Sequence, residues 1–172
     1  MQDETVIRLF PNMKRAWALQ GEQARVGISG RNAQRVLSCA LDVKSGEATV
    51  LVHQRMNSAG FQELLTAVRQ YYGKRPIFMI LDGGSLHRAA ASQKVAATLS
   101  ITLIELPRQC PELNAVDHLW RSVKADVSAN HQYKTVDKHA ATALKYVHSM
   151  TPKERLNRAG VLSKKFWLKN VL

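Results

Sequence analysis

The segment PIFMILDGGSLH, residues 76–87, determines how the rest of the chain is interpreted. Positions 77–81 hold five consecutive apolar residues, which is too short for a helix and typical of a strand buried on both faces. The run ends at Asp82, and Gly83 and Gly84 follow, where backbone or ligand can approach closely. Open α/β sheets bind ligands at the carboxyl ends of their strands. Asp82 is therefore a candidate site residue, with an ordinary helix-capping role as the alternative.

Composition predicts one basic domain over residues 1–172. The apolar content is 45%, which is enough for a core, and 25 Lys and Arg face 13 Asp and Glu for a formal charge of +12. Residues 121–172 hold eleven of the basic residues and three acidic ones, a net +8. A basic domain of this size usually meets a polyanion, so nucleic acid is the predicted partner. A solvated helical surface that happens to be basic is the alternative.

Other protein classes are disfavoured by what the sequence lacks. Cys39 and Cys110 stand apart from each other and from any Cys/His cluster, which argues against a zinc site or a disulfide framework and for a reducing compartment. No apolar run approaches the about 20 residues of a membrane span. The first ten residues do not have the pattern of a signal peptide. We therefore expect a soluble cytoplasmic protein with no membrane partner.

The apolar periodicity changes at about residue 57. Before it, residues 4–10, 35–41 and 47–53 are predicted to form an antiparallel meander, with residues 14–19 pairing back on the first strand as a short addition. After it, helices and strands alternate. The predicted elements are helices over 58–73, 86–99, 113–127 and 135–150, a short helix from Thr151, and strands over 76–81 and 101–106. This order predicts an α/β fold, a mixed sheet with helices on both faces.

Three acidic positions are expected to meet at one edge of that sheet. Asp3 opens the first strand, Asp82 ends the buried strand, and Asp117 lies beside the apolar stripe of the following helix. Clustered carboxylates repel one another, and divalent Mg²⁺ or Mn²⁺, with their preference for oxygen ligands, would relieve the repulsion. Two such ions support phosphodiester chemistry. For Asp117 the alternative is an ion pair with Arg121 or Lys124, one helical turn away.

The same reasoning predicts how stability responds to metal. Without metal, repulsion among three carboxylates destabilises the folded chain, so Asp82→Asn is expected to melt at or above the wild type in EDTA. The variant is expected to gain less than the wild type from Mn²⁺, because it has lost one ligand charge. If Asp82 were an ordinary helix cap, its loss would destabilise the chain with or without metal.

Three motifs in order resemble the catalytic domain of DDE/D transposases, in the mariner-like branch that includes many bacterial insertion sequences. QDETVIRLFP with KRAWALQGEQ is similar to the opening Asp-Glu strand and the Arg-x-Trp segment of that family, ILDGGSLH to its second-Asp motif, and LPRQCPELNAVDHLW to its third block. Asp82 and Asp117 have 34 residues between them, a spacing that the branch uses. The resemblance implies a ribonuclease-H-like fold, a mixed five-stranded sheet with helices on both faces.

The resemblance also implies roles for individual residues. Asp3, Asp82 and Asp117 map onto the catalytic acids that hold two Mg²⁺ or Mn²⁺ ions, and the function implied is metal-dependent DNA cleavage and strand transfer. His87 would orient the Asp82 loop or touch phosphate, with a structural histidine as the alternative, and Trp120 is expected to be a core anchor. The other supporting candidates are Glu4, Glu112 and Asn114; the DNA-binding candidates are Arg121, Lys124, Lys134 and Lys138. The expected partners are transposon ends and target DNA, bound by a homodimer in the cytoplasm at the nucleoid.

Two departures from the family pattern leave an alternative open. Gly83 stands where Asn is usual, and Asp3 is only the third residue, so the resemblance leads us to expect a chain without half of the first strand and without the helix-turn-helix region of the family. The alternative is a truncated, catalytically inactive fragment that binds DNA or dimerises with a full-length transposase and modulates it. A ribonuclease-H-like nuclease of another kind is a weaker third interpretation.

Overall fold

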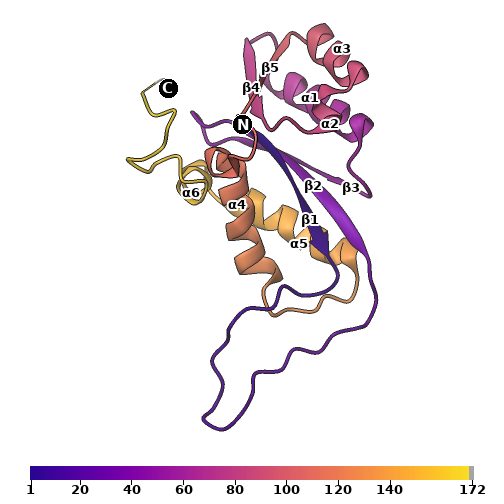
Figure 1. Ribbon diagram of the computed structural model, residues 1–172, viewed down its shortest axis with the longest axis vertical. Coiled ribbons are helices and arrows are strands. Elements are labelled where there is room, and N and C mark those ends of the chain that lie inside the picture. The colour runs from indigo at the N-terminus through magenta and orange to yellow at the C-terminus, as the bar shows by residue number, and fades with distance from the viewer. Residues whose placement is uncertain (171–172) are drawn as a thin grey trace.

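The computed structural model describes residues 1–170 and confirms an α/β fold with helices on both sides of the strands (Figure 1). The strands are β1 (Gln2–Arg8), β2 (Gln34–Leu41), β3 (Ala48–His53), β4 (Ile77–Leu81) and β5 (Ile101–Glu105). The helices are α1 (Ser58–Tyr72), α2 (Ser85–Arg88), α3 (Ala90–Thr98), α4 (Ala115–Val123), α5 (Val136–Ser149) and α6 (Pro152–Arg158). A 3₁₀ turn, η1 (Pro111–Leu113), precedes α4, and a π-helical turn, η2 (Lys124–Ser128), extends it.

Strands β1 to β3 form an antiparallel meander in which β2 is central. β1 pairs with β2 from Gln2 opposite Ala40 to Arg8 opposite Gln34, and β2 pairs with β3. In the turn between β2 and β3, the carboxylate of Asp42 accepts hydrogen bonds from the backbone N–H of Lys44 (2.9 Å) and from the hydroxyl of Ser45 (2.8 Å). These local bonds explain why the predicted hairpin forms where the sequence places it.

Two helical layers cover the strands. Helices α4 and α5 pack on one face of the meander, where Leu37, Cys39 and Leu41 are buried with Trp120. Helix α1 begins at the N-cap Asn57 and packs its apolar stripe against β4, β5 and the other face of the meander (Figure 1). The role of Trp120 as a core anchor is confirmed, since 2% of it is exposed. Among the helices described, none has the length and apolarity needed to cross a bilayer.

The strands do not form one continuous five-stranded ladder. Within residues 1–170, hydrogen bonds join β1–β2–β3 into one sheet and β4–β5 into a separate parallel pair. β1 and β4 lie beside each other, but β1 begins next to where β4 ends, so the two strands have too little overlap for a ladder. The expectation of a single mixed sheet is met in the number and direction of strands and not in their pairing.

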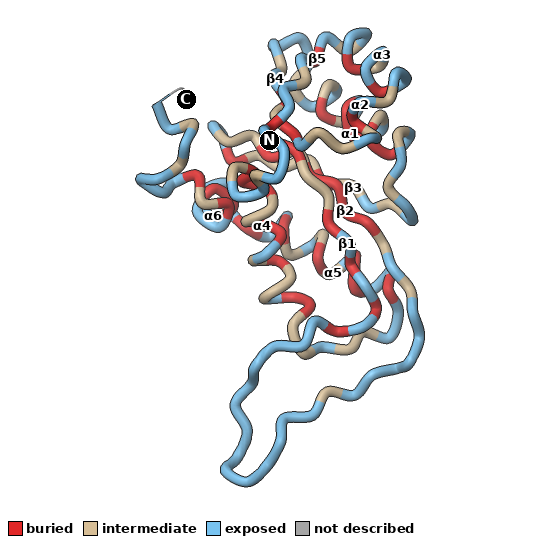
Figure 2. The backbone as a smooth tube through the Cα atoms, viewed as in Figure 1, coloured by how far each residue is buried: buried red, intermediate tan, exposed pale blue. Residues whose placement is uncertain are grey.

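Residues 14–19 do not form the predicted strand. They belong to an arm, residues 13–32, that leaves the end of β1 and extends away from the body of the molecule (Figures 1 and 2). The prediction was wrong because β2, which is longer and more apolar, already takes the edge of β1. Near its root the arm is held by the side chain of Asn130, which accepts from the backbone N–H of Lys14 at 2.8 Å.

The predicted helix over residues 86–99 is interrupted. Ala89 has extended backbone angles, φ −56° and ψ 133°, and separates α2 from α3. The predicted helix over residues 135–150 forms as one helix, α5 (Val136–Ser149), with Thr135 as its N-cap. The short helix after Thr151 is α6, closed by a capping box in which Thr151 and Glu154 exchange hydrogen bonds.

Candidate active site

Asp82 sits at the carboxyl end of β4, in a turn that only small residues allow. Its Oδ1 accepts from the backbone N–H of Gly84 at 2.9 Å and lies 2.9 Å from Nδ1 of His87. A Cβ on Gly84 would lie 3.0 Å from that carboxylate oxygen and 3.2 Å from the imidazole, so a larger residue would push the two apart. The hydrogen bond from His87 holds the pKa of Asp82 below its usual value. Asp82 is therefore ionised, and Gly84, not Asp82, caps α2.

His87 links β4 to β1 across the gap between the two sheets. Its imidazole is buried, and its Nε2 lies 3.2 Å from Oε1 of Glu4, which also accepts from the amide of Gln2 at 2.7 Å. Although burial opposes the charged form, the hydrogen bonds to Asp82 and Glu4 raise the pKa of His87 to about 9. The orienting role expected for His87 fits this geometry, because one imidazolium bridges carboxylates from two strands that share no ladder.

Asp3 points from β1 into the same region. Burial and the neighbouring carboxylate of Glu4 raise the pKa of Asp3 to about 7, and Asp117 and Asp82 add to the increase. All three expected acids, Asp3, Asp82 and Asp117, line the same cavity. Asp3 is therefore the harder of the two carboxyls to ionise, since Asp82 has the imidazolium of His87 beside it and its pKa is lowered.

Asn114 fixes the start of α4 against β1. As the N-cap of α4 it accepts from the backbone N–H of Val116 at 3.1 Å, and its amide donates to the backbone oxygen of Gln2 at 2.9 Å. Asp117 in the first turn of α4 is thereby held next to Asp3. In this structure Asp117 pairs with Arg121, which is the alternative that the helical spacing allowed.

The three carboxylates line one cavity of about 530 Å³. Its other walls are the two glycines after Asp82, the side chains of Arg88 and Asn114, and the loop 106–111. Among the residues that the structure describes, no three His, Cys, Asp or Glu side chains are already close enough together to hold a metal ion. The donor chemistry still fits a divalent ion, because three carboxylates share one cavity and one of them is costly to ionise there.

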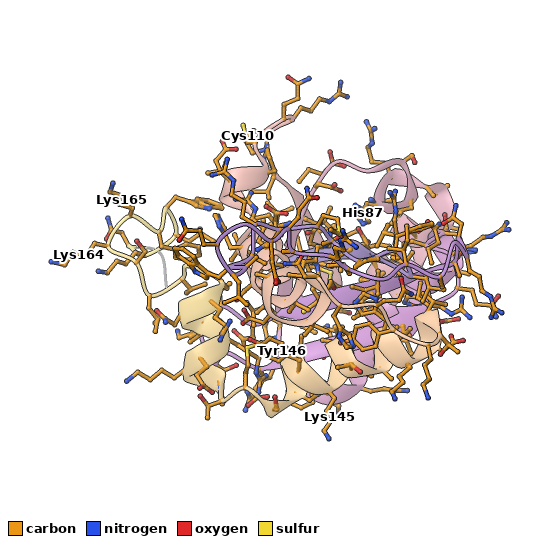
Figure 3. All side chains as sticks on the ribbon, turned by 90° about the horizontal axis from the view of Figure 1, so that it is seen from below. His87, Cys110, Lys145, Tyr146, Lys164 and Lys165 are labelled. Atoms are coloured by element: carbon orange, nitrogen blue, oxygen red, sulfur yellow. The ribbon has the colours of Figure 1, made fainter. Side chains whose placement is uncertain are left out.

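The remaining candidate residues differ in how close they lie to the three carboxylates. Lys124 is half-buried and faces Asp117 and Asp3; burial lowers its pKa and the two carboxylates oppose that effect. Lys134 and Lys138 lie around the other end of β1, where the neighbouring His139 contacts the backbone oxygen of Arg8 at 3.0 Å. Glu112 lines a different cavity, with Trp167 of the C-terminal segment. Figure 3 shows His87 in the interior, while Lys145, Lys164 and Lys165 point outward.

Two arginines in the cavity wall were missed by sequence reasoning. Arg88 and Arg108 line the cavity beside the carboxylates and are exposed. Arg108 lies in the loop that follows β5, and the same rule that singled out Asp82, ligand binding at the carboxyl ends of parallel strands, applies to it. The sequence position of Arg108 therefore already indicated that it could line the cavity. Arg88 owes its place to the break at Ala89, which the Ala-rich pattern of residues 86–99 hides.

The sequence of residues 1–139 matches the family described as DDE superfamily endonuclease. The chain belongs to this family. It is 29% identical over 133 residues to the insertion element IS630 uncharacterized 39 kDa protein of Shigella sonnei, a match that covers 76% of this chain and 39% of the relative. The DDE family assignment agrees with the order and spacing of the three acidic motifs.

The fold of the DDE chain is similar to that of the Mos1 mariner transposase. It matches Mos1 in a paired-end complex with the left transposon end (TM-score 0.72, 16% identity) and in mariner paired-end complexes with Mn (0.71, 17%) and with Mg (0.72, 17%). These matches cover 96%, 96% and 97% of this chain and 52% of each Mos1 chain. The chain thus spans about half the length of the solved proteins it matches, and less of its insertion-element relative.

Proposed function

We propose that this chain is the catalytic domain, residues 1–172, of a transposase, which cleaves DNA at the end of a mobile element and joins the freed 3′-OH to target DNA. The observation that carries the proposal is the single cavity lined by Asp3, Asp82 and Asp117 in a member of the DDE endonuclease family. We further propose that β1 and β4 act as neighbours in one ribonuclease-H-like sheet, because His87 already joins them.

Asp3, Asp82 and Asp117 are the residues that would hold Mg²⁺ or Mn²⁺, and we propose two ions. Bound divalent ions polarise the phosphodiester and lower the pKa of the attacking water. Support comes from the Mos1 neighbours, whose complexes are described with Mn and with Mg. To bind metal, Asp117 would give up its ion pair with Arg121. The guanidinium of Arg121 would then be free to bind a phosphate.

We propose that DNA approaches over the arginines of the cavity wall. Arg88 and Arg108 are exposed beside the carboxylates. Arg121 of α4 pairs with Asp117, and Lys124 of η2 faces Asp117 and Asp3. Lys134 and Lys138 lie too far along the fold to reach the same phosphates, so their proposed contacts are with DNA beyond the cleavage position. The proposed substrates are transposon ends and target DNA, at the nucleoid in the cytoplasm.

Metal-dependent cleavage tests the catalytic proposal. The purified chain, given a labelled DNA duplex, is expected to nick it with Mg²⁺ or Mn²⁺ and to stop when EDTA is added, because three carboxylates alone cannot activate water for attack on a phosphodiester. The measurement is product formation on a denaturing gel, with extension by a polymerase to identify 3′-OH ends. Nicking that persists unchanged in EDTA would contradict the proposal.

Salt dependence tests the proposed DNA surface. Arg108→Ala is expected to weaken binding to any duplex and to reduce the slope of log affinity against log salt by about 1, because one phosphate contact is lost. Lys74→Ala is the control, since Lys74 is exposed in the turn before β4, at the end opposite the carboxylates. Fluorescence anisotropy at several salt concentrations measures both. Equal slopes for the two variants would show that DNA does not contact Arg108.

The alternative, an inactive module that binds or dimerises, is supported by the arm. Large apolar side chains on it are exposed, including Trp17, which is fully exposed at 102%. Exposed apolar groups on an extended segment favour contact with another chain, so we propose a homodimer under either function. Dimer formation and DNA binding without any metal-dependent nicking would favour the alternative.

A further inference from the structure

The loop after β5 contains a residue in an unfavourable backbone conformation. Gln109 has a φ of 59°, which lies in the left-handed region. This region is costly for a residue that has a Cβ and free of strain for glycine, so turns usually place Gly or Asn there. Side chains kept in such a conformation cluster at functional sites. The observation therefore favours a functional role for the side chain of Gln109.

The loop holds Gln109 in a defined position. Pro107 and Pro111 flank the turn, and the ring of each proline fixes one backbone angle. At the start of the loop the backbone N–H of Leu106 donates to the backbone oxygen of Leu81, at the end of β4, at 2.8 Å. The loop is therefore anchored to the strand that precedes Asp82, and its turn has little freedom to move relative to that carboxylate.

Gln109 belongs to the wall of the candidate active site. The whole loop 106–111 lines the cavity of about 530 Å³ that the three carboxylates also line. Gln109 is exposed, and the next residue, Cys110, lies at the rim of the molecule (Figure 3). The amide of Gln109 is thus accessible to a ligand that occupies the cavity.

The neighbouring side chain has a complementary chemistry. Arg108 is also exposed on this wall, and its guanidinium is suited to a phosphate. The amide of Gln109 carries no charge and offers a donor and an acceptor side by side. Phosphate contacts position a protein on DNA, whereas contacts to base edges specify the sequence. The loop therefore presents a phosphate-binding group and a base-reading group at adjacent positions.

We propose that Gln109 reads a base edge of the DNA at the carboxylates and so determines the sequence preference of cleavage. The inference rests on the proposed function, because it takes DNA as the ligand of this cavity. Gln109 and the carboxylates share one cavity, and base pairs are about 3.4 Å apart, so the base lies within about three base pairs of the cleaved bond. The base is adenine, whose N6 and N7 match the glutamine amide in the major groove.

Two other roles for Gln109 fit the structure less well. A contact with a phosphate would duplicate that of Arg108, whose charge makes the stronger hydrogen bond. A turn residue without any contact to a ligand would be better as glycine, which adopts this φ without strain. Under either alternative the sequence preference of cleavage does not depend on the side chain of Gln109.

The sequences at the nicks test the proposal. The chain is given duplexes of randomised sequence with Mn²⁺, and the new 3′-OH ends are sequenced. The wild type is expected to favour adenine about fivefold or more at one position near the nick, as for a bidentate base contact. Gln109→Ala is expected to reduce this preference to less than about twofold. Gln109→Glu, which can only accept hydrogen bonds, is expected to shift it to cytosine. The same preference in the wild type and both variants would overturn the proposal.

Two further variants separate base reading from phosphate binding and from folding. Arg108→Ala is expected to slow nicking at all sequences and to keep the adenine preference, because a phosphate contact is not specific for sequence. Gln109→Gly is expected to melt at or above the wild-type temperature, since it relieves the left-handed strain, and to lose the preference as Gln109→Ala does. If Gln109→Ala instead slowed nicking by one factor at all sequences, Gln109 would contact a phosphate and the proposal would be overturned.

Binding distinguishes a failure of this proposal from a failure of the proposed function. Fluorescence anisotropy gives the affinities of the wild type and Gln109→Ala for a duplex of A·T pairs and a duplex of G·C pairs. The ratio of the two affinities is expected to be about fivefold larger in the wild type, and comparing the ratios cancels the effect of DNA shape. Unequal ratios in a chain that does not nick DNA would support base reading and contradict the cleavage proposal alone. Equal ratios would overturn base reading, whether or not the chain nicks DNA.

Discussion

Asp82→Asn and Asp117→Asn are each expected to lower the rate of metal-dependent DNA cleavage about a thousandfold or more. The two carboxylates are proposed metal ligands, and several kcal/mol of transition-state stabilisation depend on the ions they would hold, each 1.4 kcal/mol corresponding to about tenfold in rate. The measurement is the single-turnover rate of nicking of a labelled duplex in Mn²⁺, with circular dichroism to confirm that the variants are folded.

A carboxylate outside the cavity provides the control for this experiment. Asp137 is exposed at the start of α5 and pairs with Arg35 at 2.7 Å, and Asp137→Asn removes the same charge without touching the cavity. Its cleavage rate is expected to stay within about threefold of the wild type, as for most surface substitutions. If Asp82→Asn retained more than a tenth of the wild-type rate, Asp82 would not be a metal ligand.

Asp3→Asn is expected to stabilise the chain in EDTA at pH 8. The pKa of Asp3 is raised from 3.8 to about 7, so the folded state binds its proton more tightly than the unfolded state does. Stability from this group is fully present below pH 4 and is lost as the pH rises through 7. At pH 8 the wild type carries the full cost of the charge, on the order of 2–4 kcal/mol, and the Asn variant carries none of it. Thermal unfolding from pH 4 to pH 8 measures the difference, which should vanish at the acid end.

The matched control for Asp3→Asn is Asp126→Asn, which is expected to change stability in the opposite direction. Hydrogen bonds from Tyr146 and Arg158 hold the pKa of Asp126 below its usual value, so Asp126→Asn is expected to destabilise at pH 8. With Mn²⁺ added, the wild type should gain stability and Asp3→Asn should gain less, because the variant offers one charge fewer. A melting temperature of Asp3→Asn at or below that of the wild type in EDTA at pH 8 would show that the acids do not repel one another.

In the structure, the acid whose charge is expected to destabilise the metal-free chain is Asp3 and not Asp82. The sequence predicted that Asp82→Asn would melt at or above the wild type without metal, since removing this charge was expected to remove part of the repulsion among the three acids. Asp82 instead lies beside the imidazolium of His87, which lowers its pKa, so removing its charge costs stability. The sequence contains His87, but its hydrogen bond to Asp82 depends on the turn that Gly84 allows, and no pattern of residue types predicts that geometry.

Local signals predicted most of the fold. The buried run before Asp82, the hairpin at Asp42, the apolar stripe of α1 and the short helix after Thr151 all lie where the sequence placed them, because each depends on neighbours within one or two turns of chain. Competition between distant segments decided the rest. Residues 14–19 lost the edge of β1 to β2, a choice that cannot be read from either segment alone.

The candidate site was predictable to the same extent. Spacing and strand ends brought Asp3, Asp82 and Asp117 to one cavity, as expected for carboxylates at one sheet edge. The pairing of Asp117 with Arg121 was one of two alternatives that helical spacing offered, and spacing cannot rank them. Whether a basic residue lies beside the carboxylates depends on tertiary packing, which is why Arg88 was missed.

The missing ladder between β1 and β4 gives the molecule a seam. Asp82 follows β4, whose Met79 and Leu81 are buried with α1 and α3, whereas Asp3 and Asp117 lie on elements whose core includes α5 and α6; Ile80 and the contacts of α1 with β2 and β3 join the two clusters. Cooperative units of this kind can open separately at a cost below that of global unfolding. A ligand bound by acids from both units opposes this opening, because the units can separate only after the ligand dissociates. Occupancy of the cavity and the rigidity of the whole chain are then one linked equilibrium.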